Sequence, residues 1–133
     1  MEITAVEQPV ELPHQVLATA AALRLIAKLE ARHGELMFHQ SGGCCDGSSP
    51  MCYPRGEFLI GGQDVLMGTL AGTPFYMHQS QFEYWKHTQL ILDVVPGRGG
   101  MFSLDGPEGV RFLTRSRVFT DEEMKLLRAA GRI

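Results

Sequence analysis

Residues 19–40 read TAAALRLIAKLEARHGELMFHQ, and the pattern of this stretch changes from helical to strand-like at Gly34. Before the glycine, apolar residues recur at helical spacing behind Thr19, a residue type that is favoured at the N-cap. After it, the side chains of residues 35–40 alternate between two faces, as they do in a strand. We therefore expect a helix that begins after Thr19, ends at Gly34 and covers one side of a sheet.

Turn residues divide the rest of the chain into short segments with strand patterns, which are 57–60, 64–70, 73–78, 89–95, 101–104 and 110–113. Two sequences with capping-box spacing, beginning at Ser80 and Thr120, each predict the start of a helix. One helix, many strands and a final helix predict an α+β fold. The expected architecture is a single compact, mostly antiparallel β domain, with an N-terminal helix packed on the sheet and a C-terminal helix.

The chain has 133 residues, of which 44% are hydrophobic and 20% are charged. This length suits a single domain over residues 1–133, and the proline- and glutamate-containing segment 1–13 is expected to be a flexible tail. The net charge of −3 argues against general nucleic-acid binding. A glycine-rich β domain can cover exposed strand edges by association, so a homo-oligomer is expected.

The N-terminus has no basic and apolar segments of the kind that form a signal peptide, and no apolar stretch approaches the ~20 residues needed to cross a bilayer. We therefore expect a cytoplasmic protein with no membrane association. In such a reducing compartment, the three cysteines are expected to be free, metal-bound or redox-active rather than joined in structural disulfides.

All three cysteines lie within the run SGGCCDGSSPMC at residues 41–52. Thiolates favour zinc, copper(I) or iron–sulfur clusters, so this polar loop predicts a transition-metal (zinc or iron) or iron–sulfur site, although adjacent cysteines are unusual for zinc. The predicted ligands are the residues of this loop and its preceding strand that carry sulfur, imidazole or carboxylate groups: Cys44, Cys45, Cys52, His39 and Asp46. His78 and His87 are further candidates to complete the set.

Three other interpretations stay open at this point. One or two of the cysteines could be small buried hydrophobes beneath a turn. The chain could be a thiol-dependent redox enzyme or sensor, in which one cysteine is a nucleophile and another resolves its oxidised form. It could also be a non-catalytic interaction module that binds a partner through its basic C-terminal helix or its aromatic segment at residues 75–85.

The chain contains the run FHQSGGCCDGS at residues 38–48, with Gly61, Asp64-Val65, Phe102-Ser103-Leu104 and Arg111-Phe112. Through these residues it resembles the bacterial domain-of-unknown-function family seven-seven-nine over nearly its whole length. Members of that uncharacterised family are often encoded beside aldehyde dehydrogenases. The resemblance therefore implies an accessory protein whose partner is an aldehyde dehydrogenase or a related oxidoreductase.

The expected elements of this chain include, in order, a helix after Thr19, the sequence SGGC at residues 41–44 and a later glycine-rich hairpin. This order of elements is also similar to that of A-type iron–sulfur carrier (HesB-like) domains. In those domains, a comparable loop supplies one cluster ligand, and the resemblance assigns that role to Cys44. The carriers also have a Cys-Gly-Cys motif near the C-terminus, whereas residues 113–117 of this chain contain no cysteine.

Overall fold

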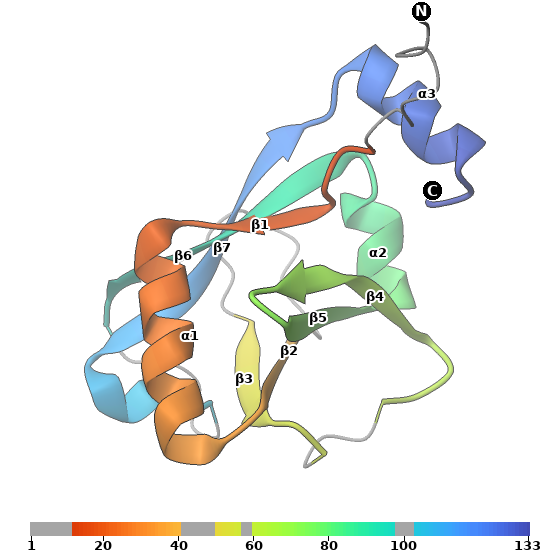
Figure 1. The fold of residues 1–133 in the computed structure, drawn as a ribbon. Coiled ribbons are helices and arrows are strands. Elements are labelled where there is room, and N and C mark those ends of the chain that lie inside the picture. Colours follow the sequence, from red (N-terminus) through yellow and green to blue (C-terminus); the bar gives the residue numbers. More distant parts are fainter. Residues whose placement is uncertain (1–11, 41–49, 57–59, 98–102) are drawn as a thin grey trace, which may run out of the picture.

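The computed structural model describes residues 12–40, 50–56, 60–97 and 103–133, which form an α+β fold of two mixed sheets and three α-helices (Figure 1). In chain order the elements are β1 (Val16–Ala18), α1 (Ala20–His33), β2 (Leu36–Gln40), β3 (Met51–Pro54), β4 (Asp64–Leu70), β5 (Thr73–His78), α2 (Gln79–Trp85), β6 (Thr88–Pro96), the short 3₁₀ helix η2 (Gly106–Glu108), β7 (Val110–Val118) and α3 (Asp121–Ala129). The predicted fold class, with its N-terminal and C-terminal helices, is confirmed.

The boundaries of α1 are those expected from its capping residues. The Thr19 hydroxyl accepts a hydrogen bond from the Ala22 N–H at 3.2 Å, and Gly34 ends the helix with φ of +80°. That backbone conformation favours glycine because it has no Cβ. One face of α1 is buried, through Ala22, Leu25, Ile26 and Leu29.

The strands form two sheets, one in the order β1-β6-β7 and the other in the order β3-β2-β5-β4. The pairs β1–β6 and β2–β5 are parallel, and the remaining pairs are antiparallel. Aromatic side chains join the sheets in the core: the Phe38 ring of β2 stacks on Phe75 of β5 at 5.8 Å and meets the edge of Phe112 of β7 at 4.9 Å. Figure 1 shows α1 and α3 at opposite ends of the molecule.

The structure adds two strands that the sequence pattern did not predict. β1 pairs with β6, and β3 occupies part of the expected cysteine loop, where it pairs with β2. β7 continues to Val118, beyond the predicted end at residue 113. All of these differences arise from pairing between strands, which the local pattern of a single segment does not reveal.

Three predicted boundaries need further comment. α2 begins after His78 rather than Ser80, because the His78 imidazole accepts the Ser80 N–H at 3.1 Å and so acts as the N-cap. In the segment 101–104, Ser103 and Leu104 form no strand, and Ile60 forms none in the segment 57–60. Residues 57–59 and 101–102, like nearly all of the expected tail 1–13, lie outside the described residues.

No helix in the part of the chain that the structure describes is both long enough and apolar enough to cross a membrane.

Thr19 should contribute measurably to stability, because its hydroxyl caps α1 and also donates a hydrogen bond to Asp93 of β6 at 3.0 Å. We expect Thr19→Ala to lower the free energy of unfolding by about 1–2 kcal/mol in urea denaturation. Thr69→Ala, at an exposed position of β4, is the matched control and should change it by less than about 0.5 kcal/mol. Equal effects of the two substitutions would contradict this role.

Candidate functional site

A buried imidazole–carboxylate pair lies at the ends of two strands of the four-stranded sheet. The Nε2 atom of His39, in β2, is 2.7 Å from Oδ1 of Asp64, at the start of β4, and the two side chains are only 4% and 9% exposed. The other carboxylate oxygen of Asp64 accepts the Gly61 N–H at 2.8 Å. Both oxygens of this carboxylate are therefore satisfied by neighbouring donors, as a buried charge requires.

The ionisation state of Asp64 determines which ring nitrogen of His39 carries the proton in this contact. Burial acts to raise the pKa of Asp64, but hydrogen bonds from His39 and Gly61, together with attraction to the His39 and His78 imidazoles, outweigh burial and lower this pKa below its usual value. Asp64 is therefore ionised at neutral pH and can only accept hydrogen bonds. Nε2 of His39 must then carry the proton in this contact, so Asp64 fixes both the orientation and the tautomer of the ring.

Strand pairing brings the two residues together. β5 lies between β2 and β4, with Tyr76 opposite His39 on one side and His78 opposite Asp64 on the other. Residues two apart in a strand face the same side, so His39 and Asp64 meet across β5. The sequence analysis missed Asp64: its only local signal is that it follows two glycines at the start of a strand, and that signal says nothing about its partner.

The predicted ligands Cys44, Cys45 and Asp46 lie outside the described residues. The segment that carries them is nevertheless anchored at both ends beside His39, because β2 leads into it and β3, which follows it, pairs Met51 with His39. Cys44 and Cys45 follow His39 by five and six residues in the sequence.

Cys52 does not join this group. It is paired with Phe38 on the core face of the sheet, whereas the adjacent pair, Met51 with His39, faces the other side. The side chain of Cys52 is fully buried, and burial followed by repulsion from Asp105 raises the pKa of its thiol to about 12. Cys52 thus has the properties of a small buried hydrophobe, which is one of the interpretations that the sequence left open. The proposed ligand set therefore does not include Cys52.

The other two histidine candidates, His78 and His87, have different surroundings from His39. His78 caps α2 and lies near enough to Asp64 to affect its pKa, whereas His87 is exposed after α2. Among the residues that the structure describes, no group of three or more His, Cys, Asp or Glu side chains could hold a metal ion. A metal at His39 would therefore require ligands outside the described residues, and the segment 41–49 carries the predicted ones, Cys44, Cys45 and Asp46.

An open apolar hollow of about 410 Å³ adjoins the pair on the same face of the sheet. Its walls include Met37 and Tyr76, which lie respectively two residues before His39 in β2 and opposite His39 in β5, together with Pro74 and Ile60. Among the described residues that line it, Arg55 is the one that is charged. Such a hollow could receive an apolar group close to the imidazole.

Residues 25–118 match the model of a family described as a domain of unknown function (DUF779). No curated protein matches the chain. The matched region contains His39, Asp64 and the whole cysteine-bearing segment.

Cys52 should be unreactive in the folded protein, because its thiol is buried and its pKa is about 12. In a Cys44→Ser/Cys45→Ser variant, which retains only this thiol, we expect no labelling by iodoacetamide at about pH 8 under native conditions and one equivalent in denaturant. Mass spectrometry measures both. Native labelling as fast as in denaturant would show that Cys52 is accessible.

Asp64 should make stability depend on pH below about 4. A carboxylate whose pKa is lowered by folding contributes stability that is complete above its unfolded pKa of about 3.9 and is lost as the pH falls through its folded pKa. We therefore expect Asp64→Asn to be less stable than the wild type at neutral pH, with the difference shrinking in acid. Urea denaturation across this range tests the prediction, and a constant difference would contradict it.

Proposed function

The chain belongs to the DUF779 family, and from this premise we propose that it binds a thiophilic metal ion through Cys44, Cys45 and His39 as an accessory protein of an aldehyde-oxidising enzyme. The observation that carries the proposal is the buried contact between His39 and Asp64 at the point where both ends of the cysteine-bearing segment are anchored. Zinc, iron and an iron–sulfur cluster are the members of this class that such ligands would suit.

The contact between His39 and Asp64 resembles that of a metal-binding histidine whose ring is oriented by a carboxylate. Histidines that bind metals usually donate their second ring N–H to a carboxylate, which orients the ring and increases its basicity. Here Asp64 accepts such a hydrogen bond from Nε2, and in this proposal the imidazole oriented in this way is a ligand of the metal. Cys44 and Cys45 supply thiolates, and Asp46 or an external ligand completes a tetrahedral site.

The accessory role rests on the resemblance to proteins encoded beside aldehyde dehydrogenases. The apolar hollow beside His39 supports it chemically, because it would bring an apolar substrate or a partner's side chain next to the proposed metal. The accessory role is tested by measuring the activity of an aldehyde dehydrogenase encoded beside this protein, with and without the protein present. An unchanged activity and no co-purification would remove the accessory role but leave the metal site standing.

A second function is favoured by the same contact. An imidazole oriented by a carboxylate can act as a general base, and it could activate the thiol of Cys44 or Cys45 as a nucleophile in a thiol-dependent redox enzyme or sensor. The two functions differ in one respect that can be measured, since the first requires bound metal and the second requires a reactive, metal-free thiolate.

Metal analysis of protein purified anaerobically and without chelators tests the metal site. We expect about one zinc or iron ion per chain in the wild type, none in Cys44→Ser or Cys45→Ser, and affinity weakened by about 10–100-fold in Asp64→Asn. Cys52→Ala and His33→Gln, which alter a buried thiol and an exposed imidazole outside the site, are controls and should retain the metal.

Metal-free wild-type protein, or equal metal content in all variants, would contradict the metal site. If the protein is metal-free and a single thiol alkylates well below its ordinary pKa of ~8.5, in a manner that depends on His39, the thiol-enzyme function is supported instead.

A further inference from the structure

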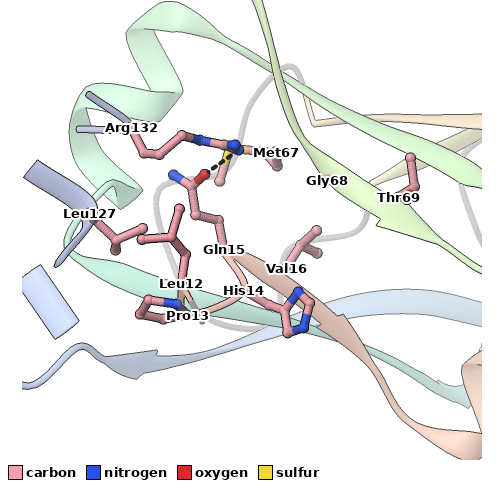
Figure 2. Close-up of a pocket in the computed structure, with 10 residues that line it drawn as sticks. All are labelled: Leu12, Pro13, His14, Gln15, Val16, Met67, Gly68, Thr69, Leu127 and Arg132. Atoms are coloured by element: carbon pink, nitrogen blue, oxygen red, sulfur yellow. Dashed lines mark hydrogen bonds between the residues drawn. The ribbon is translucent and has the colours of Figure 1, made fainter. Parts of the chain in front are cut away.

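We propose a second ligand site, a carboxylate-binding pocket of about 330 Å³ enclosed by residues 12–16, β4 and the C-terminal end of α3 (Figure 2). This site does not include His39 or Asp64 and does not depend on the metal proposal. Its distinguishing feature is a single guanidinium group, that of Arg132, at the edge of a pocket whose walls combine apolar and polar side chains.

The end of α3 determines where Arg132 lies. Gly131 adopts φ of +72°, the Gly131 N–H donates to the Arg128 carbonyl at 3.0 Å and the Arg132 N–H donates to the Leu127 carbonyl at 2.9 Å. This pair of hydrogen bonds is the Schellman motif, which reverses the chain at the end of a helix. It turns Arg132 back towards Leu127, and the two side chains line the same pocket.

The positive charge of Arg132 is not neutralised by an acidic partner within the described part of the chain. Its guanidinium donates one hydrogen bond, to the Gln15 side-chain oxygen at 2.7 Å, as Figure 2 shows. By contrast, Arg115 and Arg117 form ion pairs with Asp93 and Glu123. A guanidinium has five N–H donors in a planar fork, so Arg132 retains the capacity to bind a carboxylate with two parallel hydrogen bonds.

The wall that meets Arg132 is fixed before any ligand binds. Gln15 is only 5% exposed, and its carbonyl accepts the Leu90 N–H at 3.0 Å. The preceding carbonyl, that of His14, accepts the side-chain amide of Gln89 at 2.8 Å. Because the backbone is held to β6 at two successive residues, little ordering of this wall would be needed on binding, which favours affinity.

The remaining walls determine the class of ligand. Leu12, Val16, Met67 and Leu127 supply apolar surface. β4 approaches Val16 closely at Gly68, where an added Cβ would lie 3.1 Å from a Val16 methyl carbon, so a larger residue would crowd this wall. His14, Gln15 and Thr69 add polar surface. An arginine beside these apolar side chains is complementary to an anion with a hydrocarbon part, which inorganic phosphate lacks. The volume is at the low end for ligand pockets, which suits a small aliphatic monocarboxylate better than a large acid.

The test is a titration of the full chain with butyrate, with its uncharged isostere butyramide and with inorganic phosphate. Binding is measured by calorimetry and by NMR of the backbone amides. We expect saturable binding of butyrate, with binding of butyramide and phosphate weaker by about tenfold or more. Arg132→Gln should weaken butyrate binding by a similar factor. Arg128→Gln removes the same charge from an exposed position on α3 outside the pocket, and should leave binding unchanged.

Equal affinities for butyrate and butyramide would overturn the proposal, as would equal effects of the two arginine variants or the absence of saturable binding. Tighter binding of phosphate than of butyrate would also overturn it, by showing a general anion site instead. If Arg132→Gln does not fold, the comparison of butyrate with butyramide on the wild type still decides the question.

Discussion

The structure depends on a single strand, β2, that is buried on both of its faces. All five of its residues are buried, and it lies inside its sheet between β3 and β5. Phe38 points into the core, where it contacts Phe75 and Phe112, while His39 points to the other side and contacts Asp64. Because neighbouring side chains alternate, a shift of one residue in register would exchange these two environments. The packing of the core therefore fixes the position of the site.

The same alternation separates the cysteines. β3 runs antiparallel to β2, and its residues Met51 and Cys52 are paired with His39 and Phe38. Cys52 consequently lies in the core with Phe38, where a thiolate is strongly disfavoured, and the Ser103 hydroxyl accepts its backbone N–H at 2.9 Å. Of the three thiols clustered in the sequence, the sheet therefore places Cys52 in the core, whereas Cys44 and Cys45 lie outside the described residues.

Burial of His39 also requires a partner, since an unsatisfied polar group away from water is costly. Asp64 meets this requirement, and the Gly61 N–H stabilises the carboxylate in turn. The stability of the strand does not require an imidazole at position 39, because an apolar residue there would pack without needing a charged partner. The polar pair therefore agrees with the chemistry that we propose at this site.

Features encoded by local sequence could be predicted. The caps of α1, the capping box that begins α3 and the bounds of β4 and β5 agree with the structure, because each depends on neighbouring residues. His39 could be recognised as a candidate for the same reason, from its place before the cysteine run. Asp64 could not, nor could the burial of Cys52 or the strands β1 and β3, because these depend on how the strands pair in the sheets and not on the local pattern of one segment.

The two proposed sites also differ in their relation to the family. The matched region, residues 25–118, contains His39, Asp64 and the cysteine-bearing segment, so the first site is built entirely within the shared domain. Residues 12–16 and α3 lie outside that region, and they enclose the Arg132 pocket against β4. Since β1 also forms there and pairs with β6, the flanking segments contribute both to the stability of this chain and to a surface that the domain alone does not possess. A ligand at Arg132 would therefore modify the properties of this chain without being required for the chemistry at His39.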